Sequence, residues 1–448
     1  MNKSGNVSWE PQPAGAAWIH HQVARFRELN PTVSQFERLL AEQTGTRLAD
    51  WIDHLLVTET DGLMESGFVE SGDGWYEHPG ALLPTVKPAQ VDRMLLRVDS
   101  VSDFALAQRQ RWTLRLSGDP LDLLRCGTIE VPDAQAEFGV IEHRGCNVRQ
   151  PERVLSDREK LNIQMVREQL RLRQREFPSQ SEAFQEIRTL ISRSIELLGR
   201  DLTCDLFFEA ERDYWLSRNR AAQVQLMRQA SQGMGWGNHD HHTYRSSRSC
   251  FAQLIALFEL LGFQCRERFY AGREAGWGAQ VLEQPVCRVV IFADVDLNPD
   301  EITEDFSHQP LSPRLKLGTI GLWCALHGEA VFEAGMHHLE CQFDFDGART
   351  QLEELGIRSM KPFTDFPFLR QCFTEGERWA VNPKRIEMLR KDTRITDEQA
   401  DRFLREGAVG SHLEILERND GYRGFNQTGI NDIIRKTDPR FLTTNASH

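Results

Sequence analysis

The spacing of apolar and polar residues divides the first half of the chain into three regions. Residues 16–56 place apolar side chains three and four positions apart in "AAWIHHQVARFRELN", "TVSQFERLLAEQTG" and "RLADWIDHLLV", which predicts three helices. Residues 91–146 change to short alternating runs separated by Gly, Asp and Pro, which predicts an antiparallel sheet. Residues 151–232 return to a helical period in long, charged segments, which predicts a layer of solvated helices.

In the C-terminal half, one order of elements occurs twice. A strand at 238–246 precedes the helix "SCFAQLIALFELLGF" and three strand-like runs, "CRERFYAG", "WGAQVLEQ" and "CRVVIFADV". The second unit has the strand "GEAVFEAGMHHLECQFD", the helix "DGARTQLEELG" and a late strand, "SHLEILERN". Two tandem βαβββ units predict an internally duplicated α+β fold.

These patterns predict three parts in a chain of 448 residues, which is long enough for two or three domains. Residues 1–150 are expected to form an N-terminal α+β domain, in which 91–146 are a candidate degenerate copy of the unit. Residues 151–234 are expected to be a helical linker or layer that also offers a surface for a homodimer. Residues 235–448 are expected to form the domain of two βαβββ modules.

The composition of the chain limits the kinds of partner and the cellular compartment that we expect for the protein. The formal net charge of −13 argues against nucleic acid, which needs a basic face. The longest strongly apolar run, "LIALFELLGF", is too short to cross a bilayer. The N-terminus lacks the apolar core of a secretory signal, and nine cysteines show no CxxC pair. We therefore expect a cytoplasmic protein with reduced thiols and no membrane partner.

The opening strand of each unit carries a histidine that can point inward. In "HDHHTYR", strand alternation puts His241, Thr243 and Arg245 on one face. In "GMHHLECQF", it puts His338 and Gln342 on one face. The two histidines can meet only if the two modules close on each other, which a duplicated fold allows.

A carboxylate on a late strand completes a candidate metal site. Glu414 lies in "SHLEILER" of the second unit. Two imidazoles and one carboxylate leave about three open positions, an arrangement that suits non-haem Fe(II). Glu340 shares the face of His338 but ranks below Glu414, because a carboxylate two residues along the same strand would crowd one ligand direction. Glu375 and Glu377 are expected to lie in an exposed turn.

Three neighbouring histidines are not expected to bind the metal. His239 and His242 are expected to be surface residues or to support the ligands through hydrogen bonds. His337 is expected to point away from His338, because adjacent residues of a strand face opposite sides.

The residues named above resemble the vicinal-oxygen-chelate superfamily, and specifically the catalytic half of the 4-hydroxyphenylpyruvate dioxygenase family. Asp240–His241 matches the Asp-His pair that opens that family's third module, and "GMHHL" matches the strand that opens its fourth. "HLEILERNDGYRGFNQTGINDIIR" matches the family's closing signature and puts Glu414 at its third ligand position. Phe363 or Phe366 stands where that family has a tyrosine.

The chain is also similar to the 2-oxoadipate dioxygenase/decarboxylase family, which has a His-x-x-x-Arg strand. "HHTYR" fits this spacing with His241 and Arg245, so the resemblance implies that Arg245 holds a substrate carboxylate. Together the resemblances cover about residues 235–440. They also imply that Phe425, Asn426 and Gln427 line the pocket, which Thr243 and Gln342 would share.

The function expected on this basis is an Fe(II)-dependent dioxygenase whose partners are dioxygen and a small 2-oxo acid, or a substrate that chelates similarly. Oxidative decarboxylation and hydroxylation would follow. Three alternatives remain open: an extradiol ring-cleaving dioxygenase, a zinc-dependent lyase or isomerase, and a ligand-binding protein without turnover.

Overall fold

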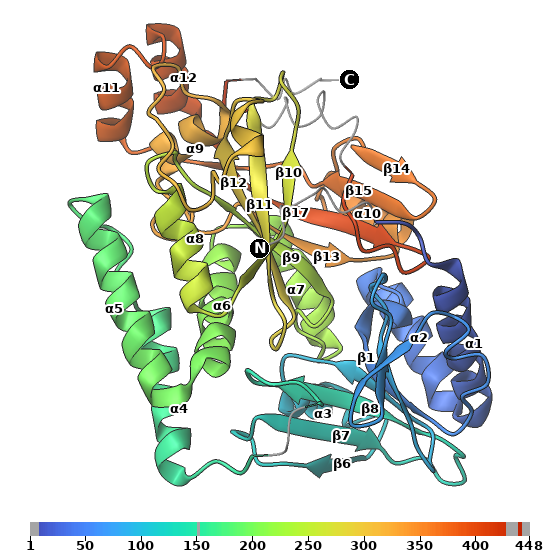
Figure 1. Ribbon diagram of the computed structural model, residues 1–448. Coiled ribbons are helices and arrows are strands. Elements are labelled where there is room, and N and C mark those ends of the chain that lie inside the picture. The colour runs from blue at the N-terminus through green and yellow to red at the C-terminus, as the bar shows by residue number, and fades with distance from the viewer. Residues whose placement is uncertain (1–8, 150–152, 427–437, 441–448) are drawn as a thin grey trace.

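The computed structural model describes residues 9–149, 153–426 and 438–440. It is an α+β molecule with one mixed β-sheet in each half of the chain (Figure 1). In this view the C-terminal sheet stands above the N-terminal sheet, and the green helices of the middle region lie beside and between them.

The N-terminal sheet has eight strands in the order β2-β3-β4-β1-β5-β8-β7-β6. They are β1 (Ile52–Val57), β2 (Val69–Gly72), β3 (Trp75–Glu77), β4 (Thr85–Pro88), β5 (Arg93–Arg97), β6 (Leu114–Ser117), β7 (Leu124–Ile129) and β8 (Glu137–His143). Counted outward from the centre of the sheet, each half has its first, fourth, third and second strand in that order: β1-β4-β3-β2 on one side and β5-β8-β7-β6 on the other. In the second half, α3 (Val101–Gln108) follows the first strand, so a βαβββ order occurs there too. Helices α1 (Pro13–Leu29) and α2 (Pro31–Thr44) share one apolar core with this sheet.

The helix predicted from "RLADWIDHLLV" is wrong. The segment forms a short 3-10 turn, η1 (Leu48–Trp51), followed by β1. Its apolar residues fit both a helical and a strand spacing, so the pattern alone does not decide. Pairing with β4 along one edge of β1 and with β5 along the other stabilises the strand.

The middle region is helical, as the spacing predicts. Its helices are α4 (Asp157–Arg171), α5 (Gln180–Leu198), α6 (Arg200–Leu216) and α7 (Arg220–Ser231). The ring of Phe208 on α6 lies 5.1 Å from the ring of His242 and 6.3 Å from that of Tyr244, both on the C-terminal sheet. The layer therefore covers the outer face of that sheet.

The C-terminal sheet has nine strands, eight of them in the order β10-β11-β12-β9-β13-β17-β15-β14. They are β9 (His239–Arg245), β10 (Gln264–Tyr270), β11 (Trp277–Gln284), β12 (Val289–Asp296), β13 (His338–Gln342), β14 (Thr364–Phe366), β15 (Leu369–Phe373) and β17 (Ala408–Arg418), with β16 (Glu377–Trp379) paired to β17. Helices α8 (Phe251–Leu260) and α10 (Phe345–Glu354) follow β9 and β13. Each module again has the order first, fourth, third, second. Because β9 and β13 pair antiparallel, the strands of the two modules form one continuous sheet.

The remaining helices are additions to the two modules. Between β12 and β13 lie η2 (Glu301–Thr303) and α9 (Thr319–His327), and between β16 and β17 lie α11 (Pro383–Lys391) and α12 (Asp397–Glu406). The last three pack together in a small apolar cluster of their own. Among the described residues, no helix combines the length and the apolar content that a membrane span needs.

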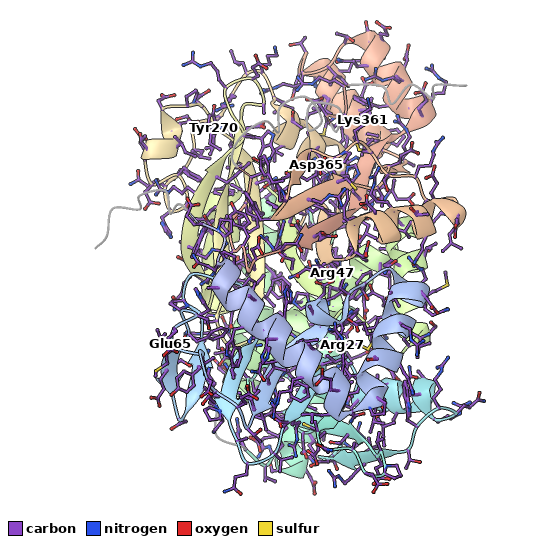
Figure 2. The ribbon with its side chains drawn as sticks, turned by 90° about the vertical axis from the view of Figure 1, so that its right-hand side faces the viewer. Arg27, Arg47, Glu65, Tyr270, Lys361 and Asp365 are labelled. Carbon is purple, nitrogen blue, oxygen red and sulfur yellow. The ribbon has the colours of Figure 1, made fainter. Side chains whose placement is uncertain are left out.

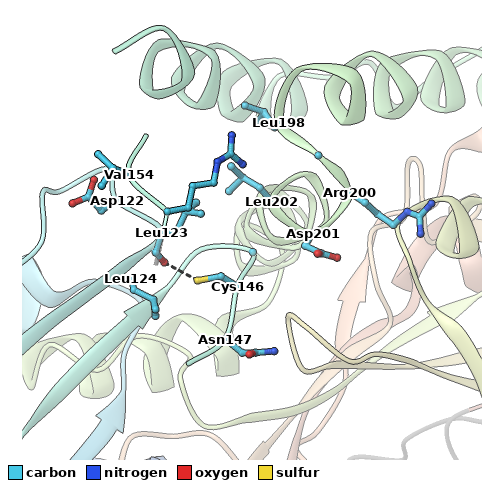
Figure 3. Close-up of a pocket in the computed structure, with 13 residues that line it drawn as sticks. Asp122, Leu123, Leu124, Cys146, Asn147, Val154, Leu198, Arg200, Asp201 and Leu202 are labelled. Carbon is cyan, nitrogen blue, oxygen red and sulfur yellow. Dashed lines mark hydrogen bonds between the residues drawn. The ribbon is translucent and has the colours of Figure 1, made fainter. Parts of the chain in front are cut away.

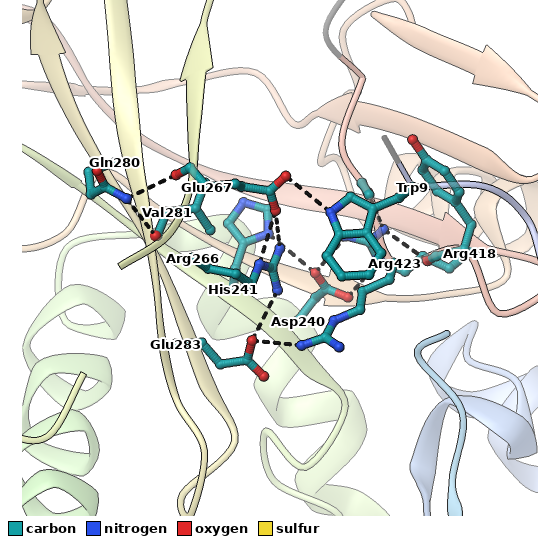
Figure 4. Close-up of polar contacts among 12 residues, drawn as sticks. Trp9, Asp240, His241, Arg266, Glu267, Gln280, Val281, Glu283, Arg418 and Arg423 are labelled. Atoms are coloured by element: carbon teal, nitrogen blue, oxygen red, sulfur yellow. Dashed lines mark hydrogen bonds and ion pairs between the residues drawn. The ribbon is translucent and has the colours of Figure 1, made fainter. Parts of the chain in front are cut away.

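Several side chains of the N-terminal half bind the C-terminal half directly, and Arg47 and Trp9 are two of them. Arg47 donates one hydrogen bond to Asn419 Oδ1 at 2.7 Å and one to the carbonyl of Arg418 at 3.0 Å, and Figure 2 shows it at the boundary between the halves. The indole of Trp9 donates to Glu267 Oε2 at 3.1 Å, across the strands of the C-terminal sheet (Figure 4). The two halves are therefore in polar contact at more than one place.

Candidate metal centre

Three side chains predicted as metal ligands converge in the C-terminal sheet. His241 on β9, His338 on β13 and Glu414 on β17 each offer a ligand atom within 4.8 Å of the others. His338 Nε2 lies 2.9 Å from Glu414 Oε2. All three are buried, with 4%, 7% and 2% of their surface exposed.

The register of the three central strands explains the convergence. β13 lies between β9 and β17, antiparallel to the first and parallel to the second. Glu340 on β13 is paired with His241 on one side and with Glu414 on the other. Since directly paired residues face the same side of a sheet, alternation brings His338 to that side as well.

Hydrogen bonds orient both imidazole rings. His338 Nδ1 lies 2.8 Å from His337 Nδ1, which leaves Nε2 beside Glu414. His241 Nδ1 lies 3.3 Å from Asp240 Oδ1 and contacts Glu340 Oε2, which leaves Nε2 as its available nitrogen. Neighbours that hold one ring nitrogen and free the other are typical of metal-binding histidines. The prediction that His337 points away from His338 is wrong, because the two rings share this contact.

Glu340 adds a second carboxyl group to the centre. Gln371 Nε2 donates to Glu340 Oε1 at 2.9 Å and to Glu414 Oε1 at 3.2 Å, so one amide connects the two. Burial, and next the charge of Glu414, raise the pKa of Glu340 well above its usual range. Burial raises the pKa of Glu414 to about 8. Two adjacent buried carboxyl groups with two imidazoles form an environment that a divalent cation would stabilise, so the residues present fit a metal.

Asp240 connects the centre to the turn that follows β17. Its carboxylate accepts two hydrogen bonds from Arg418, at 2.8 and 3.0 Å (Figure 4). Burial acts to raise the pKa of Asp240, but Arg418 holds it below its usual range. Arg418 also donates to the carbonyls of Tyr422 at 3.2 Å and Gly424 at 2.7 Å. The same arginine thereby fixes the turn that leads to Phe425.

A cavity of about 70 Å³ adjoins the three ligands. Its wall is mostly aromatic and is made by His241, Thr243, Phe269, Trp277, Phe292, Asp294, His338, Phe363, Gln371, Phe373, Glu414, Phe425 and Asn426. Thr243, Phe425 and Asn426 were predicted to line the pocket and do lie there. Gln342 is not part of the wall, because its amide donates to Asp240 Oδ2 at 3.0 Å. Gln427 lies outside the described residues.

Arg245 stands behind this cavity rather than in its wall. Its guanidinium lies 5.5 Å from the ring of Trp323, and its Nε lies 3.9 Å from Asp294 Oδ2. Nε and Nη1 are buried without a hydrogen-bond partner among the described residues, and burial lowers the pKa of the group. The side chain that faces the cavity here is Asp294, which sequence reasoning missed. An acidic residue within the apolar run "CRVVIFADV" was the available signal.

The remaining predicted polar residues lie away from the cavity. His242 is 0% exposed on the opposite face of β9, so the expectation of a surface residue is wrong for it. Burial lowers its pKa well below the usual range. His239 is half-buried on that side, with its ring 5.3 Å from the ring of His242. Glu375 is exposed as expected and pairs with Arg358 at 2.9 Å.

A larger cavity, of about 440 Å³, lies elsewhere, between the N-terminal sheet and the start of α6 (Figure 3). Leu123, Cys146, Asn147 and Leu202 are among the residues around it. Among its described residues, the wall includes no histidine and two acidic residues, Asp122 and Asp201. It therefore has no donor set comparable to that of the candidate metal centre.

Comparisons with known proteins give only remote likenesses. No family model matches the chain, and no curated protein matches it. Among solved structures, a mutant 4-hydroxymandelate synthase from Streptomyces coelicolor is 11% identical, with 75% of this chain and 93% of that chain covered and a TM-score of 0.31. Methylmalonyl-CoA epimerase from Mycobacterium tuberculosis is 14% identical, with coverage of 41% and 88% and a TM-score of 0.24. A catechol 2,3-dioxygenase is 9% identical, with coverage of 84% and 89% and a TM-score of 0.20. At these values the likenesses carry no argument about activity, and the fold assignment rests on the strand order.

Proposed function

We propose that this protein is an Fe(II)-dependent dioxygenase that acts on a 2-oxo acid or on a substrate that chelates in the same way. One observation carries the proposal: two imidazoles and one carboxylate from three adjacent strands meet beside a buried cavity. That donor set is the one that non-haem iron oxygenases use. Arg245 was predicted to bind a substrate carboxylate, but it lies behind the cavity wall, so it has no direct role in this proposal.

In this mechanism His241, His338 and Glu414 would hold the metal. Fe(II) held in this way would supply the chemistry of oxygen activation to a 2-oxo acid bound in the cavity. The contacts of His337 and Glu340 keep the ring nitrogens of the two histidines aimed at one point. The phenylalanines around the cavity would keep water away from the reacting groups.

The first experiment measures metal content and oxygen uptake. Protein purified without oxygen and reconstituted with Fe(II) should bind about one ion per chain and consume dioxygen when a 2-oxo acid is added. His338→Ala should lose both, because two donors rarely hold a divalent ion. His20→Ala is the matched control, since His20 is an exposed histidine on α1 and belongs to none of the candidate ligand groups. Full metal binding by His338→Ala would contradict the proposal.

The same donors favour one alternative. Two histidines and a glutamate with an open fourth position also form a catalytic zinc site. Full activity with zinc alone, and no oxygen uptake, would move the assignment to a lyase or isomerase of the same fold.

A further inference from the structure

A second group of metal-binding side chains lies at one edge of the C-terminal sheet. Glu259, Cys265 and His308 each offer a donor atom within 4.8 Å of the others, and all three are exposed. Glu259 lies in the last turn of α8, Cys265 on the edge strand β10, and His308 in the segment between β12 and β13. The candidate metal centre stands on the three central strands, so the two groups are separate.

Asp305 orients the imidazole of His308. Both carboxylate oxygens of Asp305 lie close to His308 Nδ1, at 2.9 and 3.0 Å. On the other side of the ring, Nε2 lies 2.9 Å from Glu259 Oε1. A carboxylate that holds one ring nitrogen fixes the tautomer and directs the other nitrogen toward a metal. Asp305 is therefore placed as a supporting residue, and His308 Nε2 as a ligand beside Glu259 and Cys265.

The segment that carries His308 is fixed by the two residues before it. The ring of Phe306 stacks on the ring of Phe251 at the start of α8, with 5.8 Å between the ring centres. Ser307 Oγ donates to Gln280 Oε1 on β11 at 2.8 Å. Phe306 and Ser307 are both buried. The imidazole is thus anchored beside α8 and β10 and does not depend on a free loop for its position.

The charges around this group favour a divalent cation. Glu259 lies at the C-terminal end of α8, where the helix dipole is negative, and the last turn of α8 has no basic residue. Asp305 adds a second carboxylate, which pairs with Arg268 at 3.7 Å. A divalent ion bound by one carboxylate and one thiolate would be neutral as a unit. The pair of Asp305 and Arg268 would be neutral beside it.

The types of donor favour zinc over calcium and magnesium. A thiolate, an imidazole and a carboxylate all bind zinc, whereas calcium and magnesium take oxygen ligands. In a tetrahedral zinc site with bonds of about 2.0–2.3 Å, ligand atoms lie about 3–4 Å apart. Small rotations of exposed side chains are enough to reach this spacing from 4.8 Å. Three protein ligands leave the fourth position to water.

We propose that Glu259, Cys265 and His308 form a second metal site, which binds zinc and ties the segment between β12 and β13 to α8 and β10. The inference goes beyond the proposed function and does not rest on it. Asp305 is a positioning residue in this assignment. Binding replaces the proton of the Cys265 thiol by the ion, and no group is oxidised or reduced. The competing interpretation is a protonated His308 that only bridges Glu259 and Asp305, and it gives Cys265 no role.

The test uses Co(II) as a spectroscopic probe in the full-length protein, handled without oxygen. Cobalt bound to a thiolate gives a charge-transfer band in the near ultraviolet, and the three ligands of the candidate metal centre include no cysteine. Wild type and His338→Ala should both show the band, and Zn(II) should displace it. Cys265→Ser should lose the band. Cys126→Ser is the matched control, because Cys126 lies on β7 of the other sheet and is outside the ligand groups found among the described residues.

Titration of the same band separates the ligands from the positioning residue. Glu259→Gln and His308→Ala should each need at least about a hundredfold more Co(II) to develop it, because a lost ligand costs more than a lost supporting group. Asp305→Asn should keep the band and need about ten- to a hundredfold more Co(II). His20→Ala should match wild type.

Two results would overturn the inference. One is the absence of the thiolate band in wild type, which would leave His308 as a bridge between two carboxylates. The other is a band that Cys265→Ser retains. Wild type that shows the cobalt band but takes up no oxygen with Fe(II) and a 2-oxo acid would count against the proposed function alone and would leave the second site supported.

Discussion

The surroundings of Asp294 disfavour its ionised form, so the stability of the protein should depend on pH. Burial raises its pKa from 3.8 to about 7, although Arg245 acts to lower it. A carboxyl group with a raised folded-state pKa contributes stability that is complete below about pH 4 and is lost as pH rises through 7. Asp294→Asn removes this loss, so its Tm should rise relative to wild type between pH 5 and pH 8. Scanning calorimetry of both proteins at pH 5 and pH 8 measures this change. A difference in Tm between variant and wild type that is the same at both pH values would contradict the prediction.

At the same scale, the three candidate ligands were predictable and their supporting residues were not. Alternation within single strands placed His241 and His338 on candidate faces, and the motif around Glu414, through the family it resembles, identified the third candidate. The contacts of His337 and Glu340 depend on how β9, β13 and β17 are paired. A single sequence does not contain that register, so Glu340 could be interpreted only as a competing ligand.

At the scale of elements, the start of α7 connects the helical layer to the strand that carries Glu414. Asn219 caps the helix by accepting from the backbone N–H of Ala222 at 2.9 Å. Its amide also donates to Ser411 Oγ on β17 at 2.8 Å. Asn219 and Ser411 are both 0% exposed, so neither group has water as a substitute partner.

We expect Asn219→Ala to lower the free energy of unfolding by roughly 2–4 kcal/mol, because the loss of a cap adds to an unsatisfied buried hydroxyl. Urea denaturation measures the change. Ser156→Ala is the control: Ser156 caps α4 in an exposed capping box, and its loss should cost about 1 kcal/mol. Equal losses in the two variants would show that the bond to Ser411 contributes nothing.

The order of elements in the C-terminal half was predictable because each module repeats the same change from strand to helix and back. The structure of the segment "RLADWIDHLLV" was not predictable, because its apolar spacing fits both a helix and a strand. In β1, Asp53 and His54 are both buried, because Asp53 accepts from His143 at 3.0 Å and from Arg288 at 3.2 Å. Polar residues that are buried through distant partners break the correlation between apolar character and burial on which such predictions depend.

At the scale of the whole molecule, the turn between β11 and β12 reaches the N-terminal sheet. Arg288 in this turn binds Asp53 on β1, and the carbonyl of Cys287 accepts from Arg97 Nη2 on β5 at 3.3 Å. Burial acts to raise the pKa of Asp53, but His143 and Arg288 hold it well below its usual range. The turn is therefore a connection between the two sheets.

Arg288→Ala should lower the free energy of unfolding by about 1–3 kcal/mol, because Asp53 stays buried and loses one donor. Arg358→Ala is the control, since its pair with Glu375 is exposed and should contribute less than about 1 kcal/mol. Denaturation followed by tryptophan fluorescence compares the two. A smaller loss in Arg288→Ala than in the control would exclude this connection as a source of stability.

The candidate ligands stand on the three central strands of one sheet and not on loops. Their spacing is thus set when β9, β13 and β17 pair, before any ion arrives. Because the site is preorganised, metal binding should require little movement of the backbone. The rate of binding should therefore depend on how an ion reaches the buried site. It also means that neither module alone carries all three candidate ligands, which makes the duplication itself a condition for the proposed metal site.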